Sequence, residues 1–411
     1  MSAFYDTLET RDPAEREQAQ FAALPQQLAN AKEHAAAFVN LLEDVEPQDV
    51  RSREALAKLP VLRKSELVER QKSDPPFGGL AAISPAKARR VFASPGPIYE
   101  PEGRGKDYWR LARALFAAGV RAGDLIHNTF AYHFTPAGVM LESGAEALGC
   151  AVIPAGVGQT ELQVQAIAHL RPAAYVGTPS FLNIILDKAA EMKADVSSIT
   201  KGLVSGEALP PSLRKQLDDR GVDVLQCYAS ADLGLIAYES GAKEGLIIDE
   251  GVIVEIVRPG TGEPVPEGEV GEVVVTTLTP EYPLIRFGTG DLSAVLSGES
   301  PCGRTNMRIK GWMGRADQTT KVKGMFVHPS QVAAVMLRHA EVTRARLVVE
   351  SLDNQDVMTL HCEVAMRDAK LVEAIASSLR EVCKLRGEVK LVEPGSLPND
   401  GKVIDDVRTY E

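Results

Sequence analysis

Between Tyr108 and Tyr228 the chain alternates short apolar runs with stretches of helical periodicity. This alternation limits the possible folds more than any other feature, because strands separated by helices of this length predict a parallel sheet covered on both faces. The predicted strands are Cys150–Pro154, Ala173–Gly177, Leu203–Gly206 and Val224–Tyr228, and the predicted helices are Tyr108–Val120, Thr160–His169, Ser180–Met192 and Pro211–Arg220.

In a sheet of this kind, ligands bind at the carboxyl ends of the strands. Four stretches should therefore surround one crevice: Ala155–Thr160, Thr178–Ser180, Ser205–Ala208 and Tyr228–Asp232. We expect a binding site there.

The remaining segments predict other kinds of structure. Residues 14–45 and 52–71 read as scaffold helices, with no chemistry expected in them. Alternating apolar residues in Gly251–Val257 and Gly271–Leu278 predict a small antiparallel subdomain. Beyond Asp317 a compact α+β unit is expected, with helices Pro329–Arg338 and Lys370–Leu385 and strands Arg346–Glu350, Met358–Val364 and Glu388–Val392.

Composition narrows the class of protein. The 411 residues suit two domains, and the net charge of −11 argues against general nucleic-acid binding, which depends on Lys and Arg. The five cysteines are scattered, which fits a reducing compartment. No signal peptide is evident, and no apolar run reaches the roughly 18 residues of a membrane span. We expect a cytoplasmic protein that binds no membrane.

Two dense blocks lie between Tyr282 and Val332. In PLIRFGTGDL (residues 283–292), glycines deliver Asp291 onto a loop, where its carboxylate suits the two hydroxyls of a ribose. In GRADQTTKVKGMFVHPSQV (residues 314–332), Gly314 and Asp317 open a segment that contains Arg315, Lys321 and Lys323 and is interrupted by Gly324. The two blocks together give a fixed acid, then a flexible joint, then mobile cations. This order suits chemistry on a nucleotide.

These blocks resemble motifs of the adenylate-forming ligases, and the second is similar to the hinge motif of their phenylacetate–CoA ligase branch. Further matches are VIPAGVGQTELQVQAI, SGEALPPSLRKQL, YASADLG and the tail SLPNDGKVIDDVR. The resemblance extends from about residue 52 to residue 408. It implies an α/β protein with a large N-terminal domain (1–314) of mostly parallel sheets plus the antiparallel subdomain, and a mobile C-terminal α+β lid (315–411) hinged near Asp317.

The resemblance also implies roles for individual residues. Tyr228 would stack on adenine, Asp232 would bind Mg²⁺, and Lys402 would contact the carboxylate and the α-phosphate. Lys323 and Gly324 would lie on the coenzyme A side after the lid has rotated. The implied nucleotide-binding set is Ser205, Gly206, Glu207, Ala208, Tyr228, Ala229, Ser230, Asp291 and Arg315.

Three positions depart from the family pattern. The phosphate-binding loop keeps Ser94 and Gly96, but it contains prolines, which lack an N–H, and Glu100, which would repel phosphate. We therefore predict a turn rather than a phosphate cradle. The magnesium position is Asp232, one methylene shorter than the usual Glu. Only Cys302 remains of a zinc-type segment, so no structural zinc is expected.

The resemblance implies that an acid, ATP, Mg²⁺ and coenzyme A are used to form an acyl-adenylate and then a thioester. Tyr132, Phe134, Ala155 and Gly156 would line the acyl pocket, which favours an aryl or arylacetic acid over a small aliphatic one. Two alternatives stay open: a non-CoA acceptor, and an impaired homologue that only binds an acyl-CoA or adenylate. A homodimer is a further expectation.

Overall fold

The computed structural model describes residues 3–95, 97–316, 318, 320–322, 325–352 and 355–408. The chain divides into two compact units. The first contains Met1–Val254, Val275–Phe287 and Leu296–Trp312, and the second contains Glu255–Val274, Gly288–Val295 and Met313–Glu411.

A nine-stranded sheet forms the centre of the first unit, in the order β14-β15-β10-β9-β8-β7-β6-β4-β5. Strands β5, β4, β6, β7 and β8 are parallel, which confirms the predicted parallel sheet. Strands β9, β10 and β15 continue it in antiparallel pairing, which was not predicted. The bounds are β4 (Leu125–Asn128), β5 (Ala151–Pro154), β6 (Ala174–Gly177), β7 (Lys201–Val204), β8 (Asp223–Ser230), β9 (Gly234–Glu239), β10 (Leu246–Ile248), β14 (Val295–Leu296) and β15 (Arg308–Ile309).

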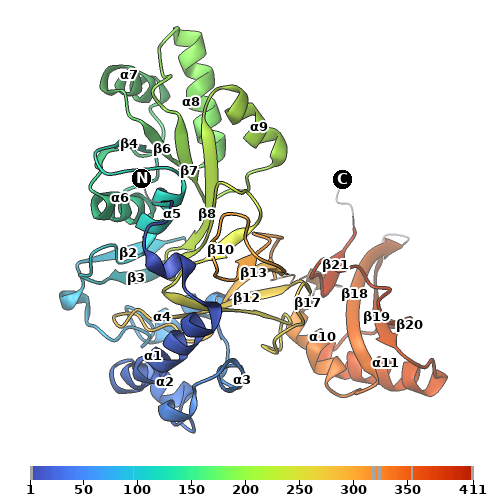
Figure 1. Cartoon of the computed structure of the whole chain (residues 1–411). Coiled ribbons are helices and arrows are strands. Elements are labelled where there is room, and N and C mark those ends of the chain that lie inside the picture. Colours follow the sequence, from blue (N-terminus) through green and yellow to red (C-terminus); the bar gives the residue numbers. More distant parts are fainter. Residues whose placement is uncertain are drawn as a thin grey trace. The chain divides into compact units, whose positions relative to one another are not determined.

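Two layers of helices cover this sheet because successive side chains of a strand point to opposite faces. In β6, Ala174 and Val176 join the core cluster of α5 (Leu111–Ala117) and α6 (Ala137–Leu148). The intervening Tyr175 joins the cluster of α7 (Thr160–Leu170), α8 (Pro179–Met192) and α9 (Pro211–Asp219). Figure 1 shows α5 and α6 in teal and α7 to α9 in green.

The N-terminal segment forms the expected scaffold. Helix α1 (Pro13–His34) begins where the Asp12 carboxylate accepts hydrogen bonds from the N–H groups of Ala14 and Glu15. The other elements are α2 (Ala36–Leu41), α3 (Arg53–Leu56), α4 (Leu67–Ser73), the 3₁₀ turns Thr7–Thr10, Pro47–Asp49, Lys64–Glu66 and Pro85–Lys87, and the antiparallel hairpin of β2 (Arg90–Ser94) and β3 (Ile98–Glu102).

A separate four-stranded sheet contains the predicted strands of the antiparallel subdomain. Its order is β1-β13-β12-β11, with β1 (Leu62–Arg63), β11 (Val252–Val257), β12 (Gly271–Thr277) and β13 (Phe287–Ser293). Asp291 therefore lies within a strand and not on a loop as expected. The glycines on either side of Thr289 lie inside β13, which continues past them to Ser293.

The C-terminal part of the second unit is the predicted α+β fold. Its sheet has the order β20-β19-β18-β21, in which β18 and β19 are antiparallel and each also pairs with a parallel neighbour. Helix α11 buries Ile375, Leu379 and Cys383 at a spacing of four residues, which packs one helical face on the sheet. The bounds are β16 (Thr320–Val322), β17 (Met325–Val327), α10 (Pro329–Met336), β18 (Val342–Leu352), β19 (Gln355–Val364), α11 (Ala369–Cys383), β20 (Glu388–Val392) and β21 (Ile404–Asp406).

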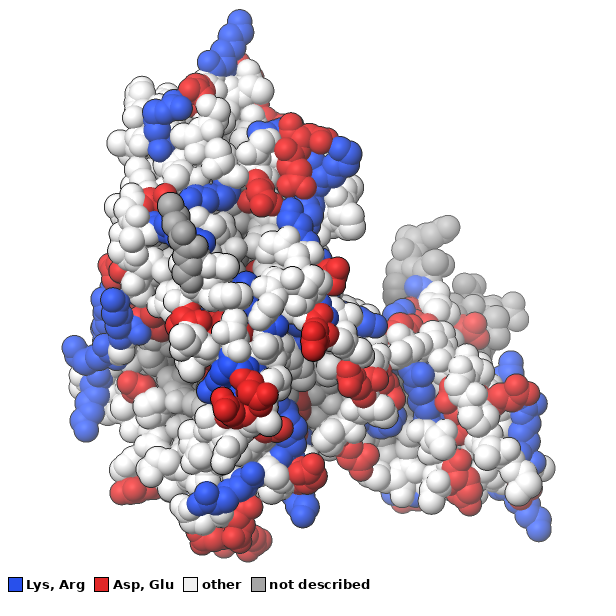
Figure 2. All heavy atoms as spheres, in the orientation of Figure 1, with Lys and Arg blue, Asp and Glu red and all other residues white. Residues whose placement is uncertain are grey.

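Charge is mixed on the face of the molecule in Figure 2, where Lys and Arg are interspersed with Asp and Glu. Within the described ranges, no helix has the length and apolar character needed to cross a membrane.

Candidate active site

The carboxyl ends of β6, β7 and β8 hold the Ser205–Ala208 stretch in place. Ser205 directly follows β7, and its hydroxyl donates to the carbonyl of Cys227 in β8 at 2.8 Å. Its N–H donates to the carbonyl of Gly177 in β6 at 3.1 Å. The stretch is thus fixed across three strands, while Gly206, Glu207 and Ala208 are exposed at the surface.

The Tyr228–Asp232 stretch lies at the end of β8. This strand continues two residues beyond its predicted end, because β9 folds back and pairs Tyr228 with Ala237 and Ser230 with Gly234. Tyr228, Ala229 and Ser230 are therefore strand residues, each partly buried. Asp232 lies in the turn between the two strands.

Asp232 is paired with a lysine from a distant segment. The Lys64 ammonium lies 2.6 Å from Asp232 Oδ2. The Asp232 side chain is fully buried, whereas 29% of the Lys64 side chain is exposed. Burying a carboxylate is costly unless a counter-charge is near, and Lys64 supplies that charge. The segment that contains Lys64 was expected to be scaffold only.

The phosphate-loop region is a hairpin whose two strands are linked by side chains. Ser94 faces Ile98 across the hairpin, and its hydroxyl donates to the carboxyl of Glu100. Glu100 is only 2% exposed. Burial raises the pKa of Glu100 to about 8, and the Asp232 carboxylate nearby adds to the shift. At neutral pH Glu100 is therefore mainly protonated, so the repulsion of phosphate expected from this residue is largely removed.

Three buried oxygens in this region lack a hydrogen-bond partner among the described residues. They are Asp232 Oδ1, Glu100 Oε2 and the Tyr282 hydroxyl. Burial raises the pKa of Tyr282, and the nearby Asp232 and Glu100 carboxyl groups raise it further. The three groups therefore interact electrostatically. Buried polar groups normally have a hydrogen-bond partner, so these three oxygens mark the surroundings of the β8–β9 turn as a candidate place for a polar ligand.

The residues that the sequence assigned to an acyl pocket are linked to the end of β4. The Asn128 amide donates to the Tyr132 hydroxyl and to the Gly138 carbonyl, both at 2.8 Å. The Asn128 carbonyl accepts the N–H of Gly156 at 3.0 Å. Tyr132 and the Ala155–Gly156 loop are thus linked through one residue. Phe134 has a φ of 60° and its side chain is 83% exposed, so it is not enclosed by a pocket in this structure.

In the second unit, Asp291 and Arg315 form a pair. Arg315 Nη1 lies 2.9 Å from Asp291 Oδ1, and the two backbones form an isolated antiparallel bridge. Gly290 has a φ of 74°, and a Cβ there would lie 2.8 Å from Arg315 Nη2. The positive φ favours a glycine at this position, whereas the flexible tip of Arg315 could move away from an added Cβ. Both residues were assigned to the nucleotide site, and the structure brings them together.

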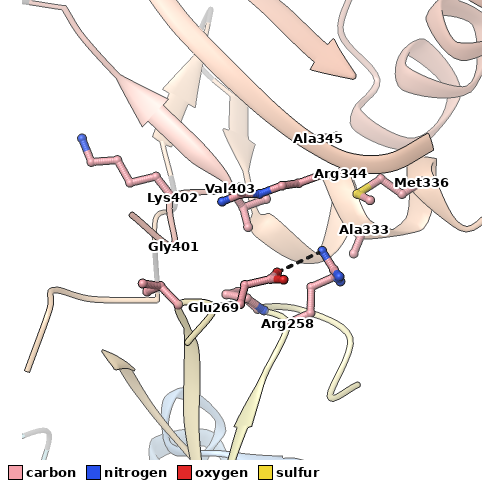
Figure 3. A pocket seen from close by; sticks show the side chains of 11 residues that line it. Arg258, Glu269, Ala333, Met336, Arg344, Ala345, Gly401, Lys402 and Val403 are labelled. Atoms are coloured by element: carbon pink, nitrogen blue, oxygen red, sulfur yellow. Dashed lines mark ion pairs between the residues drawn. The ribbon is translucent and has the colours of Figure 1, made fainter. Parts of the chain in front are cut away.

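Lys402 lies on the loop before β21. Its ammonium is 2.7 Å from Asp405 Oδ1, and 49% of its side chain is exposed. Lys402 borders a small pocket of the second unit, where it extends away from the ion pair of Arg258 and Glu269 (Figure 3). An exposed lysine with one weak surface partner can move to a new partner at little cost.

Four predicted site residues lie outside the described residues: Gly96, Asp317, Lys323 and Gly324. Their roles stay predictions.

Sequence reasoning missed Lys64, the buried role of Glu100, and Tyr282. Lys64 lies in the segment 52–71 that was expected to be scaffold, and nothing in a sequence shows that it meets a residue 168 positions away. Glu100 was noticed as a departure from a loop motif. Its inward orientation follows from its place opposite Phe92 in the hairpin.

Comparisons with known proteins identify the family of the chain. A family model described as AMP-binding enzyme matches residues 107–279, and a model described as AMP-binding enzyme C-terminal domain matches residues 324–407. The two matches and the fold define a class, the AMP-binding enzymes.

Individual relatives narrow the class. Phenylacetate-coenzyme A ligase of Thermus thermophilus is 33% identical over 356 residues, which are 82% of this chain and 79% of the relative. Phenylacetate-coenzyme A ligase of Aromatoleum evansii is 32% identical over 375 residues, 85% of this chain and 83% of the relative. The chain belongs to the phenylacetate-coenzyme A ligase family of AMP-binding enzymes. This confirms the predicted family and its class, acid–thiol ligase.

A solved structure is also similar over most of the chain. It is an open conformation of 2-hydroxyisobutyryl-CoA ligase in complex with 2-HIB-AMP and CoA, with a TM-score of 0.73 and 26% identity. The match covers 97% of this chain and 92% of that one. The predicted fold class is confirmed.

Magnesium fits this site only as a partner of a substrate. Asp232 offers one buried carboxylate with an unpaired oxygen. No group of three or more His, Cys, Asp or Glu residues that could hold a metal occurs in the described ranges. Mg²⁺ is commonly held by one or two carboxylates together with substrate phosphates and water. Asp232 suits that role and does not form a metal site of its own.

Proposed function

We propose that this protein activates a carboxylic acid, with an aryl or arylacetic acid favoured, by reaction with ATP and then transfers the acyl group to coenzyme A. The observation that carries this proposal is the arrangement at the β7 and β8 ends. Ser205 is anchored to both neighbouring strands, and Asp232 lies in the next turn with an unpaired buried oxygen.

In the first step, a carboxylate oxygen of the acid attacks the α-phosphorus of ATP. The bond to the β-phosphate oxygen breaks, and pyrophosphate leaves. Negative charge accumulates on the α-phosphoryl oxygens, so cations placed there lower the barrier. Lys402 supplies one such charge in this proposal. Magnesium bound with ATP at Asp232 would neutralise further phosphate charge.

Each unit contributes residues that would bind part of the nucleotide. The exposed Gly206–Ala208 stretch and the ring of Tyr228 would bind adenine, and the Asp291 carboxylate would accept hydrogen bonds from the ribose hydroxyls. Arg315 lies 2.9 Å from that carboxylate and would keep it ionised and oriented.

In the second step, the thiol sulfur of coenzyme A attacks the acyl carbon, and AMP leaves with the bonding electron pair. A rotation of the C-terminal lid about Asp317 would remove Lys402 and bring Lys323 and Gly324 toward the thiol path. The cytoplasmic location and the homodimer are further parts of this proposal, and no structural zinc is included in it.

The identity of the acid is the least constrained part of the proposal. The two curated relatives are named for phenylacetate, whereas the solved relative is named for 2-hydroxyisobutyrate. Tyr132 offers an aromatic wall whose hydroxyl is already bonded to Glu142 at 2.9 Å. The small Ala155 and Gly156 leave room for a ring, which favours the larger acid.

A second candidate function is favoured by the hairpin at Ser94–Glu100. Pro95 and Pro97 lack N–H donors, and Glu100 is buried against Ser94 in place of a cation. A protein with this hairpin would bind acyl-adenylate or acyl-CoA while making the adenylate slowly. The other alternative is an enzyme that forms the acyl-adenylate and transfers the acyl group to an acceptor other than coenzyme A.

Product analysis separates these functions. The wild-type protein is incubated with ATP, Mg²⁺, coenzyme A and one acid from a panel of benzoate, phenylacetate and 2-hydroxyisobutyrate. Mass spectrometry then measures AMP and the acyl-CoA thioester. The proposal expects both products in equal amounts, with phenylacetate or benzoate fastest. AMP without a thioester indicates another acceptor, and neither product with any acid indicates a binding protein.

A further inference from the structure

Beneath the loop that is proposed to border the acid lies a buried pair of polar side chains. His127 in β4 is fully buried and Gln163 in α7 is 3% exposed. His127 Nε2 lies 2.8 Å from Gln163 Oε1. The amide nitrogen of Gln163 donates to the carbonyls of Gly156 at 2.9 Å and Gly158 at 2.7 Å. One side chain thus links the sheet interior to both ends of a short loop.

The hydrogen-bond pattern fixes the roles of both groups. A glutamine amide has two N–H donors, and here both are used on backbone carbonyls. Its oxygen must then accept, so His127 carries a proton on Nε2. Burial lowers the pKa of His127, which keeps the ring neutral. With a neutral ring and one tautomer, the hydrogen bond between His127 and Gln163 keeps the same geometry near neutral pH.

The loop above the pair has little other support. Gly156 and Gly158 have φ values of 68° and 74°, and Gln159 has a φ of 46°. A Cβ added to Gly156 or Gly158 would meet no atom within 4 Å, so both glycines border open space. The side chain of Val157, between them, is 63% exposed. The backbone shape therefore depends on the Gln163 bonds and on the Gly156–Asn128 bond.

We propose that His127 and Gln163 are positioning residues that hold the Gly156–Gly158 loop in the shape that accepts the acid. This inference rests on the proposed function. His127 and Asn128 are consecutive in β4, and they act on the two acyl-pocket segments from opposite faces of the strand. Asn128 holds Tyr132 and the Gly156 N–H, and His127 holds the Gly156 and Gly158 carbonyls through Gln163. Two consecutive residues at the end of β4 thus determine the positions of both segments of the proposed acyl pocket.

The test compares two glutamines of the same helix. Gln163→Met keeps the side-chain volume and removes the three hydrogen bonds, and Gln165→Met changes an exposed glutamine two residues away. In Gln163→Met we expect the KM for the acid to rise about 10-fold or more, as for the loss of one or two hydrogen bonds, with the KM for ATP within about 2-fold. Discrimination between phenylacetate and 2-hydroxyisobutyrate should also weaken. Gln165→Met should match the wild type.

A second measurement does not depend on turnover. Hydrogen–deuterium exchange is followed in a peptide that spans the Gly156–Gly158 loop, in the wild type and in both variants. Exchange should accelerate in Gln163→Met and stay unchanged in Gln165→Met. His127→Phe, which leaves Gln163 in place but removes the donor to its oxygen, should shift exchange in the same direction. The double variant should resemble Gln163→Met alone because the two residues act as a unit.

The outcomes separate the two proposals. If the wild type turns over no acid, the proposed function fails, and the exchange measurement alone decides whether the pair positions the loop. If folded Gln163→Met keeps both its acid KM and the wild-type exchange rate, the inference is overturned. Equal increases in the KM values for acid and ATP would also overturn it, because they indicate a general loss of structure.

Discussion

The ammonium of Lys64 lies 2.6 Å from the carboxylate of Asp232, although 168 residues separate the two in the sequence. The pair places a cation at the β8–β9 turn, close to Glu100 of the β2–β3 hairpin. Part of Lys64 reaches solvent while Asp232 is fully buried. A phosphate group that arrives at this turn would therefore meet Lys64 first.

Lys64→Met should weaken ATP binding by about 10-fold, because a charged hydrogen bond contributes roughly 1.5–3 kcal/mol. AMP, which lacks β- and γ-phosphates, should be affected less than about 2-fold. Calorimetric titrations of both nucleotides on the wild type and on Lys72→Met, an exposed lysine nearby, provide the comparison. Equal shifts for ATP and AMP would exclude the phosphate role of Lys64.

The same pair predicts a stability effect. Lys64→Met alone should lower the free energy of unfolding by roughly 3–5 kcal/mol, because it leaves the Asp232 carboxylate buried without a counter-charge. The double variant Lys64→Met/Asp232→Asn should recover most of that loss. Urea unfolding of the three proteins measures the coupling, and additive losses would show that the two residues do not interact.

Glu100 predicts that stability depends on pH. Its pKa is about 8 in the folded protein, raised from 4.5. Below pH 4.5 the carboxyl is protonated in both states, so its stabilising contribution is fully present. As pH rises toward 8, the unfolded chain releases this proton more readily, and stability falls by at most about 1.4 kcal/mol per pH unit.

Glu100→Gln should remove this loss. The free energy of unfolding of the wild type should fall relative to that of the variant between pH 5 and pH 8, as the pKa of Glu100, raised to about 8, requires. Glu43→Gln, which changes an exposed carboxyl, serves as the control. Parallel pH profiles for the wild type and Glu100→Gln would mean that Glu100 is ionised throughout this range.

Asp291→Ala should weaken ATP and AMP binding alike, since both nucleotides carry the ribose. Each hydrogen bond to a charged carboxylate contributes roughly 1.5–3 kcal/mol, so a loss of about 100-fold or more is expected for two bonds. Arg315→Ala should produce a smaller loss in the same direction. Unchanged nucleotide affinity in folded Asp291→Ala would show that the ribose binds elsewhere.

The sequence predicted the fold well where the pattern is local. The β6 strand and helices α7, α8 and α11 follow from apolar spacing and caps, and their bounds agree closely. The ends of β8 and the strand position of Asp291 were wrong, because both depend on pairing with strands that a local pattern does not reveal.

The site was predictable only in part for the same physical reason. Motifs identified Asp232, Asp291 and Arg315, and the structure shows the last two in contact. The Lys64–Asp232 pair and the link from His127 through Gln163 to the Gly156–Gly158 loop are tertiary contacts. Their residues come from different elements, so no spacing rule connects them.

Lys402 should separate the two half-reactions. Lys402→Ala should abolish adenylate formation, because its charge is needed only while pyrophosphate leaves. Thioester formation from a supplied acyl-adenylate and coenzyme A should be retained. Rapid-quench measurements of each half-reaction provide the test, with Lys384→Ala as a control from a turn of the same unit. Similar losses in both steps would contradict the role.

The most direct measurement is acid-dependent exchange of labelled pyrophosphate into ATP by the wild-type protein, with Lys402→Ala as the inactive control. This exchange requires reversible formation of an acyl-adenylate and needs no acceptor thiol. The account predicts exchange with phenylacetate or benzoate, none without acid, and none in Lys402→Ala. An absence of exchange with every acid of the panel, in wild-type protein that still binds AMP, would contradict an adenylate-forming activity.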